Sequence, residues 1–117
     1  MGIADIRDGD GAGLARALGA RARFDLVDVS DPEQVAALVE RTVAGFGGLD
    51  IMVNNAAVSS PLRGLLDDDL ADFHRVMGVN VLGVMAGTKF AARHMADHGG
   101  GSVVNMTSIA ASWRVAG

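Results

Sequence analysis

The sequence predicts a three-layer α/β fold, in which a parallel β-sheet carries helices on both faces. Short apolar segments alternate with longer amphipathic segments along the chain, as in βαβ units joined by right-handed crossovers. The most strand-like segment is 49–57, with the sequence LDIMVNNAA. Gly48 precedes it and polar residues follow its apolar part, so we expect a strand that is buried on both faces.

The composition indicates one domain or part of one, and it argues against several functions. Half of the 117 residues are hydrophobic and the mean hydropathy is +0.29, which suggests a piece of a larger core. The net charge of −4 argues against a nucleic-acid partner. Without cysteine, the chain has neither disulfides nor thiolate chemistry, and we expect a cytoplasmic protein. No apolar run is long enough to span a membrane, and we expect no membrane partner.

The first half of the chain predicts two strands, each followed by a helix. The strands are expected at 1–6 and 23–28, and the helices at 8–19 and from the start signal at 30–33 to about 46. The second helix has a strong start signal, because Ser30 can cap it, Pro32 suits its first turn and Glu33 completes a capping box. Two glycines at 47–48 end this helix.

The second half predicts a loop, a helix with an interruption and a last buried strand. The loop covers 58–66, the helix starts at 67 and pauses at Gly78-Val79-Asn80, its longer part runs to about 98, and the strand covers 102–106. Three aspartates at 67–69 complement the helix dipole. Three glycines at 99–101 stop the long helix, and the tail at 109–117 supports no clear prediction.

Four segments resemble the short-chain dehydrogenase/reductase family in order and spacing. They are Asp5 at a strand end, Asp28-Val29 after the next strand, Asn54-Asn55-Ala56-Ala57, and Asn80 followed by VVNMTS at 103–108. The resemblance covers the whole chain and implies that 1–117 is part of a Rossmann-like dinucleotide-binding domain. It implies an oxidoreductase that interconverts an alcohol and a ketone by hydride transfer with a nicotinamide cofactor, acting on a small alcohol or carbonyl substrate.

By this resemblance, the first strand ends at the ribose of the cofactor. Asp5, with Ile6 after it, matches the acid that accepts hydrogen bonds from the adenosine ribose hydroxyls. Its charge would repel a 2′-phosphate, so NAD is favoured over NADP. Arg7 is a complication, because a guanidinium nearby could receive that phosphate. The alternative is that Asp5 is an ordinary exposed acid in a turn.

The second strand is implied to end beside the adenine ring. Asp28 matches the carboxylate that accepts from the exocyclic amine, and Val29 matches the residue whose backbone amide faces a ring nitrogen. The alternative is that Asp28 belongs to a helix-capping cluster with Ser30 and Asp31.

The segment after the third strand is implied to shape the floor of the cofactor site. Asn54, Ala56 and Ala57 match the family's Asn-Asn-Ala-Gly signature. Ala57 stands where the family usually has glycine, and its methyl group disfavours a positive φ and crowds a ligand slightly.

Asn80 and Ser108 match catalytic residues of the family. Asn80 matches the asparagine that interrupts the long helix and holds a water of the proton relay, and asparagine is a poor helix former. Ser108 matches the serine that binds the substrate carbonyl oxygen, although a serine after a strand is also an ordinary turn residue. His94 and His98 lie four residues apart, but nothing completes a metal site with them, so we expect no metal.

The helix at 80–98 is implied to form a homo-oligomer interface. Gly83, Gly87 and Ala91 make a small-residue stripe along it, and the alternative is that this stripe packs against the chain's own sheet. A second candidate function uses the same helix: a non-catalytic module that assembles with a full-length relative or another protein. A third candidate is a simple adenosine-ribose binder.

Two parts of the family pattern are missing, so the predicted fold lacks its first strand and its C-terminal strands. The phosphate-binding glycine loop should precede Asp5 by roughly 20–30 residues. The catalytic tyrosine and lysine should follow Ser108, but the chain has no tyrosine and its one lysine is Lys89. We therefore expect the chain alone to be inactive. We also expect the strands at 2–6 and 49–54 either to pair directly or to borrow a strand from a partner.

Overall fold

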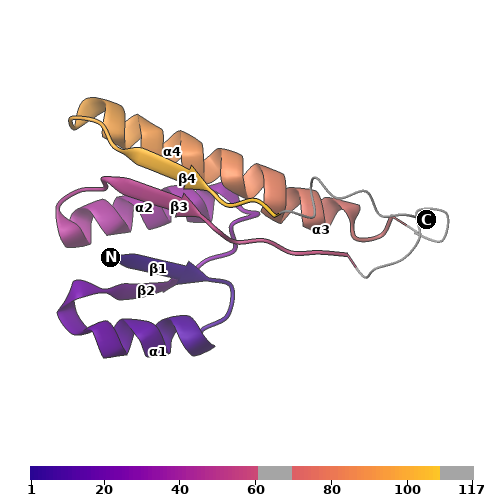
Figure 1. Ribbon diagram of the computed structural model, residues 1–117, viewed down its shortest axis with the longest axis horizontal. Coiled ribbons are helices and arrows are strands. Elements are labelled where there is room, and N and C mark those ends of the chain that lie inside the picture. The colour runs from indigo at the N-terminus through magenta and orange to yellow at the C-terminus, as the bar shows by residue number, and fades with distance from the viewer. Residues whose placement is uncertain (61–69, 109–117) are drawn as a thin grey trace.

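The computed structural model describes residues 1–60 and 70–108, which form the expected incomplete α/β fold. The elements are, in chain order, β1 (Gly2–Asp5), α1 (Gly9–Leu18), the 3₁₀ turn η1 (Gly19–Arg21), β2 (Arg23–Leu26), α2 (Pro32–Phe46), β3 (Ile51–Asn54), α3 (Phe73–Met77), the π-helical η3 (Gly78–Gly83), α4 (Val84–Asp97) and β4 (Ser102–Asn105). All four strands point the same way (Figure 1), so their carboxyl ends share one edge of the molecule. No helix in the described ranges is long and apolar enough to cross a bilayer.

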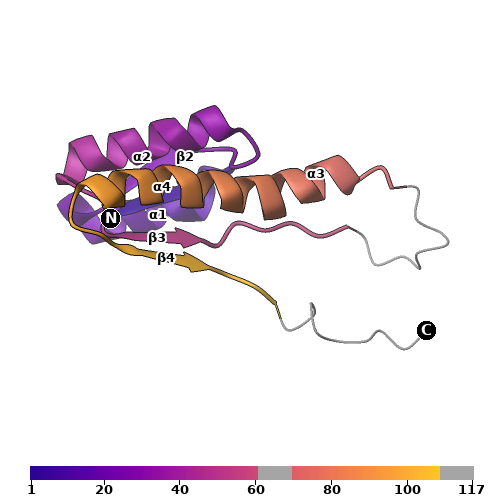
Figure 2. The same cartoon turned by 90° about the horizontal axis from the view of Figure 1, so that it is seen from above.

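The strands form two parallel pairs instead of one sheet. β1 pairs with β2, starting with Gly2 opposite Arg23, and β3 pairs with β4, starting with Ile51 opposite Ser102. Among the described strands, β1 and β3 are not hydrogen-bonded to each other, so the alternative in which they pair directly is wrong. Helix packing holds the two strand pairs together, because α2, which covers the first pair, packs against α4, which covers the second (Figure 2).

Helices cover both faces of the β1–β2 pair. On one face, Gly11 of α1 allows a close approach, since a Cβ there would lie 2.7 Å from Cε2 of Phe24 and 3.5 Å from Cγ2 of Ile3. On the other face, a Cβ at Gly2 would lie 2.9 Å from Oγ1 of Thr42 in α2. Helices α1 and α2 therefore lie on opposite faces, as a three-layer fold requires.

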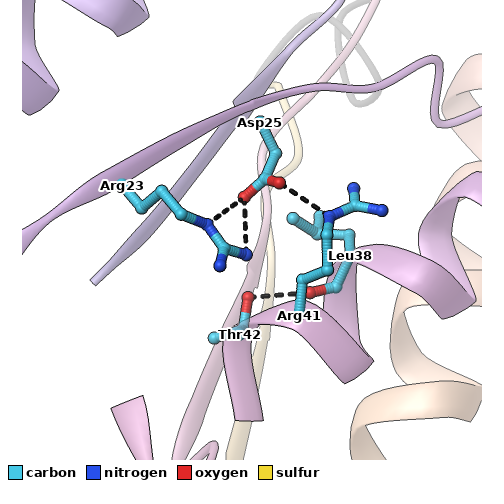
Figure 3. Close-up of polar contacts among 5 residues, drawn as sticks. All are labelled: Arg23, Asp25, Leu38, Arg41 and Thr42. Carbon is cyan, nitrogen blue, oxygen red and sulfur yellow. Dashed lines mark hydrogen bonds and ion pairs between the residues drawn. The ribbon is translucent and has the colours of Figure 1, made fainter. Parts of the chain in front are cut away.

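A charged cluster fastens α2 to β2 (Figure 3). Oδ2 of Asp25 accepts a hydrogen bond from Nε of Arg23 at 3.0 Å, and Oδ1 accepts one from Nε of Arg41 at 2.7 Å. The Asp25 side chain is only 10% exposed, whereas both arginines reach solvent. One largely buried carboxylate thus receives two guanidinium groups, and the contact fixes α2 against the strand that leads to Asp28.

Helix α4 covers one face of the β3–β4 pair. Met52 lies on the covered face, where a Cβ at Gly87 of α4 would come within 2.9 Å of its Cε atom. On the opposite face, Ile51 is 63% exposed and Val53 is 53% exposed. The prediction that this strand is buried on both faces is therefore wrong, and Val104 of the last strand is also 44% exposed.

The start of one predicted helix differs from the structure. The helix expected from 67 begins at Phe73, because Leu70 has a left-handed φ of 57° and cannot continue a helix. Positions 61–69, with part of the predicted loop and the first turn of that helix, lie outside the described residues.

The N-cap of α2 is Asp31 instead of Ser30. Oδ1 of Asp31 accepts from the Glu33 N–H at 2.9 Å, and Oδ2 accepts from Nε2 of Gln34 at 3.0 Å. The hydrogen bond from the Gln34 side chain and then that from the Glu33 backbone lower the pKa of Asp31 below its ordinary value. Pro32 occupies the first turn as expected.

Candidate functional site

The segments predicted to form the site lie along the carboxyl edge of the strands (Figure 1). The ladder continues past β1 and β2, where the Val27 N–H donates to the Asp5 carbonyl at 2.9 Å. It also continues past β3 and β4, where the Met106 N–H donates to the Asn54 carbonyl at 3.0 Å. Asp5 is therefore adjacent to the turn at 27–29, and Asn54 is adjacent to the segment that ends at Ser108. Ligands of open parallel sheets bind at this edge.

Asp5 places a carboxylate and a guanidinium at the same point of the edge. Its Oδ1 accepts from the Arg7 N–H at 2.9 Å, and Nε of Arg7 lies 3.9 Å from the same oxygen. The Arg7 side chain is 87% exposed, so this ion pair is weak and the side chain can move aside. Ile6 is also exposed, at 61%. The edge thus carries an exposed carboxylate that can accept hydrogen bonds and a cation two residues away.

Asp28 takes part in the turn before α2, as the alternative interpretation expected. Its Oδ1 accepts from the Ser30 N–H at 2.9 Å and from the Ser30 hydroxyl at 2.6 Å. The Asp28 N–H donates to Oε1 of Gln34 at 3.0 Å. Among the described residues, Oδ2 of Asp28 has no hydrogen-bond partner. The turn therefore holds the carboxylate in place and leaves one oxygen for a ligand.

The π-helical segment η3 packs against this turn. A Cβ at Gly78 would lie 3.2 Å from Cβ of Ser30, and one at Gly83 would lie 2.9 Å from Cγ2 of Val29. Glycine at both positions lets the wider π-helical turn touch the backbone that follows β2. The predicted interruption at 78–80 is therefore a change of helix type within one continuous helix, a feature often found at functional sites.

Asn80, in the middle of η3, holds the segment that follows β3. Its Oδ1 accepts from the Val58 N–H at 2.9 Å and its Nδ2 donates to the Val58 carbonyl at 2.8 Å. Arg75 adds a second tie, because its Nη2 donates to the Ser59 carbonyl at 3.0 Å. No sequence motif pointed to Val58 as the partner of Asn80, from which it lies 22 residues away. The helix thus joins the ends of β2 and β3 at one edge.

The Asn54 side chain points into the fold instead of towards the open edge. Its Nδ2 donates to Oδ1 of Asn105 at 2.8 Å and to Oγ1 of Thr88 at 3.2 Å. This network ties β3 to β4 and α4, and it assigns a supporting role to the Asn54 amide. One signal for this network was present in the sequence, because Asn54 and Asn105 each end a predicted strand. The structure pairs these two positions in register.

The two alanines that follow are exposed at the edge. Among the described residues, Leu70 is the only non-glycine residue with a positive φ, so Ala57 is not in the left-handed region. Its methyl group therefore causes no backbone strain. Ala56 and Ala57 leave the floor of the edge open, and Ser108 is exposed just beyond β4.

The small-residue stripe of the long helix packs against the chain's own fold. Ala91 has no exposed surface, Gly83 abuts Val29, and Gly87 abuts Asn54. The alternative of close internal packing is therefore correct for these three positions. The rings of His94 and His98 stack with centroids 4.1 Å apart, and no group of three or more metal-binding side chains occurs in the described part of the chain.

Comparison with known proteins identifies the family. A family model described as enoyl-(acyl carrier protein) reductase matches residues 2–117. Cis-4-hydroxycyclohexanecarboxylate dehydrogenase of Sinomonas cyclohexanicum is 40% identical over 92% of the chain. (+)-Borneol dehydrogenase 2 of Salvia officinalis is 42% identical over 94% of the chain. The chain belongs to the short-chain dehydrogenase/reductase family of oxidoreductases.

Solved structures share the fold. A short-chain type dehydrogenase/reductase from Mycobacterium marinum superposes with a TM-score of 0.86, 29% identity and coverage of 96% of the chain. ElxO with NADP bound superposes with a TM-score of 0.83 at 29% identity, also over 96% of the chain. The chain spans 44% of the first of these dehydrogenases, 40% of the second, 47% of the Mycobacterium structure and 46% of ElxO.

Proposed function

We propose that residues 1–117 form the adenosine-binding core of an oxidoreductase that interconverts a small alcohol and its ketone. The observation that carries this proposal is the shared carboxyl edge, where Asp5, Asp28, the segment at 54–58 and Ser108 follow four parallel strands. The names of two relatives, a hydroxycyclohexanecarboxylate dehydrogenase and a borneol dehydrogenase, support an alcohol as the substrate class. When bound, a nicotinamide cofactor supplies or accepts the hydride.

The donor and acceptor groups at this edge fit the adenosine half of the cofactor. One oxygen of Asp28 is free for the adenine amine, and Asp5 is exposed for the ribose hydroxyls. The phosphate half fits less well, because the first turn of α1 carries Asp10 after an aspartate at the N-cap. A pyrophosphate would be repelled there.

We propose NAD as the cofactor of this oxidoreductase. A 2′-phosphate would lie against the Asp5 carboxylate and be repelled by it. The guanidinium of Arg7 is already paired with this carboxylate, with Nε 3.9 Å from Oδ1 of Asp5. The pair is exposed, however, so Arg7 could turn towards a phosphate, and the related ElxO structure has NADP bound. The choice between the two cofactors therefore rests on which of the two charges dominates at the ribose.

For catalysis, we propose that Ser108 donates a hydrogen bond to the substrate oxygen and that Asn80 orders the edge beside it. Reduction of a carbonyl also needs an acid that protonates the developing alkoxide. The 117 residues include no tyrosine, and the ammonium group of Lys89 lies 5.5 Å from the ring centre of Phe90 on α4. The 117-residue polypeptide alone is therefore proposed to bind adenosine without turnover. The non-catalytic assembly module is the second candidate.

Calorimetric titration of the 117-residue protein tests both parts of the proposal. AMP and NAD are expected to bind weakly, with Kd of about 1 mM, and Asp5→Ala is expected to abolish the heat. NADP should bind more weakly than NAD, and Arg7→Ala should increase that difference.

Asp97→Ala is the matched control, because it removes an exposed acid at the C-terminal end of α4 and should leave AMP binding unchanged. Absence of AMP heat would contradict the adenosine site. Formation of NADH with a panel of secondary alcohols would contradict the proposed lack of turnover.

We further propose that the complete oxidoreductase is a homo-oligomer through the helix at 80–98. The small-residue stripe is buried, so the interface must use other residues of the helix and of the turns before it. Exposed apolar side chains occur at Met77 (40%), Val81 (41%) and Met85 (63%). Burial of such side chains against a second subunit is favourable by about 25 cal/mol per Å².

Sedimentation velocity tests this interface. The 117-residue protein is expected to show a concentration-dependent dimer, and Met85→Glu is expected to make it monomeric. Leu14→Glu changes a residue of α1 that is 50% exposed and should leave the dimer intact. A wild-type monomer at every concentration, or a dimer that Met85→Glu does not affect, would exclude this interface.

A further inference from the structure

Strand β2 lies on the outside of the β1–β2 pair (Figure 1), and its outer edge has free backbone groups. The N–H groups of Arg23 and Val27 donate to carbonyl groups within the first five residues, on the β1 side. In a parallel ladder, alternate residues direct their N–H and C=O groups to opposite sides of the strand. Phe24 and Leu26 therefore direct theirs outwards, where no strand of the described residues pairs with them. Such an edge can accept a strand from another polypeptide.

A hollow of about 400 Å³ lies beside this edge, between α1 and β2. Phe24 forms part of its wall, and none of the described residues of β1 lines it, so the hollow opens on the outer side of β2. Further along the strand, Leu26 is 62% exposed. The hollow exists because four of its lining residues are small, namely Ala12, Ala15, Gly19 and Ala22. We call this hollow, together with the outward backbone groups of Phe24 and Leu26, the β2 groove.

The two faces of the strand give the two sides of the β2 groove different chemistry. Phe24 points towards α1, since a Cβ at Gly11 would lie 2.7 Å from its Cε2 atom. Arg23 points towards α2, since a Cβ at Gly45 would lie 3.2 Å from its Nη1 atom. The α1 side is therefore apolar and hollow, and the α2 side carries the charged cluster around Asp25.

The β2 groove carries an excess of positive charge. Arg16 and Arg23 line it, and the neighbouring Asp25 carboxylate accepts hydrogen bonds from both Arg23 and Arg41. Three guanidinium groups and one carboxylate give this part of the surface a net charge of +2. Arg16 is exposed and has no hydrogen-bond or ion-pair partner among the described residues. The β2 groove is therefore complementary to an anionic partner.

We propose that the β2 groove binds an extended acidic segment of another protein, which adds to the β1–β2 pair as a further strand. Alternate side chains of a strand point to opposite faces. Those on the α1 side enter the hollow and must be apolar, whereas those on the α2 side lie beside Arg23 and are acidic. Backbone hydrogen bonds then supply the affinity, and the alternating side chains supply the specificity. The ligand is thus a segment in which valine-like residues alternate with glutamate or aspartate.

A second copy of the chain is a poorer occupant of the β2 groove. Direct pairing of two β2 strands would bring together two surfaces that each carry a net charge of +2. Like charges that meet across an interface disfavour association. An acidic segment instead neutralises these charges.

The experiment measures the exchange of backbone amides with water by NMR in the full 117-residue protein, with and without a synthetic peptide. The probe is acetyl-SVEVEVS-amide, in which valine alternates with glutamate. In one control peptide, lysine replaces both glutamates and reverses the charge. In the other, serine replaces the valines and keeps the charge.

Binding predicts a specific pattern of protection. If Kd is about 1 mM, about 5 mM probe lowers the unbound fraction about sixfold, so exchange at Phe24 and Leu26 should slow by about the same factor. Exchange at 103 and 105, the outward amides of β4, should not change. Both control peptides should bind more weakly than the probe.

Arg16→Glu is expected to weaken binding of the probe about fivefold, because a repulsion replaces an attraction at an exposed position. Arg93→Glu is the matched control variant, since it makes the same change of charge at an exposed position of α4. This variant should bind the probe as the wild type does.

Four results would overturn the proposal. They are unchanged exchange at 24 and 26, equal slowing at 103 and 105, equal binding of either control peptide or by the Arg16→Glu variant, and slowing at 24 and 26 with rising protein concentration in the absence of peptide. The last result would assign the β2 groove to a second copy. None of these readouts depends on cofactor binding, so failure here is distinguishable from failure of the proposed function.

Discussion

Replacing Gly87 with alanine is expected to destabilise the protein by about 2 kcal/mol. An added Cβ would overlap the side-chain oxygen of Asn54 and would lie 2.9 Å from Cε of Met52. In an open helix site the same change would stabilise by about 0.5–1 kcal/mol, because glycine loses more backbone entropy on folding. Overpacking at a tight contact costs typically about 1–3 kcal/mol and occasionally more, so the clash dominates. Urea unfolding followed by circular dichroism measures the difference.

Gly13→Ala is the matched control for this prediction. Gly13 also lies within a helix, but the nearest atom to an added Cβ is Nη2 of Arg16 at 4.0 Å. This variant should be as stable as the wild type or slightly more stable. Removing the Asn54 side chain as well should recover part of the cost of Gly87→Ala, because the two sites are in contact. Equal stability of the two single glycine variants would show that α4 does not approach β3 this closely.

The order of elements and the meeting of site segments at one edge were predictable because they depend on local periodicity. Strands of four residues and helices of ten or more have different apolar spacings, and parallel crossovers place all strand ends together. Helix α2 ended where predicted, since Gly47 adopts a left-handed φ of 81° that few other residues tolerate.

The cap of α2 was misassigned although the sequence contained the signal. Proline is favoured at the first helical position, so the residue just before Pro32 is the natural N-cap. That residue is Asp31, and its carboxylate can also reach Gln34. Ser30 was then free to bond Asp28 and to hold the turn at the candidate site.

The burial of the strand faces and the packing or hydrogen-bond partners of individual residues could not be predicted, because both depend on contacts between segments that are distant in the sequence. The apolar run at 51–53 is compatible with burial of both strand faces. In the structure, α4 covers only one of these faces. The spacing of Gly83, Gly87 and Ala91 is equally suitable for packing against the chain's own strands and against another subunit. The Asn80 side chain gave no indication of its bonding partner, which is the backbone of a loop.

Replacing Asn80 with alanine is expected to destabilise the protein by about 2 kcal/mol and to loosen the segment after β3. The change removes two hydrogen bonds to Val58 and leaves its N–H and C=O without a partner in a half-buried place. Each lost hydrogen bond costs about 1 kcal/mol, and an unsatisfied buried group costs about 1–3 kcal/mol. Amide exchange at 56–60 should therefore accelerate more than exchange in β1 and β2.

Asn55→Ala is the matched control, because Asn55 is an exposed asparagine of the same segment. Its replacement should change stability by less than about 0.5 kcal/mol, as at most surface positions. If Asn80→Ala accelerates exchange equally in all strands, the asparagine supports the whole fold and not this edge in particular. If exchange at Val58 does not change, the hydrogen bonds to its backbone do not hold the loop. A local effect would establish that the π-helical turn fixes the edge at which Asp28 and Ser108 are proposed to meet their ligands.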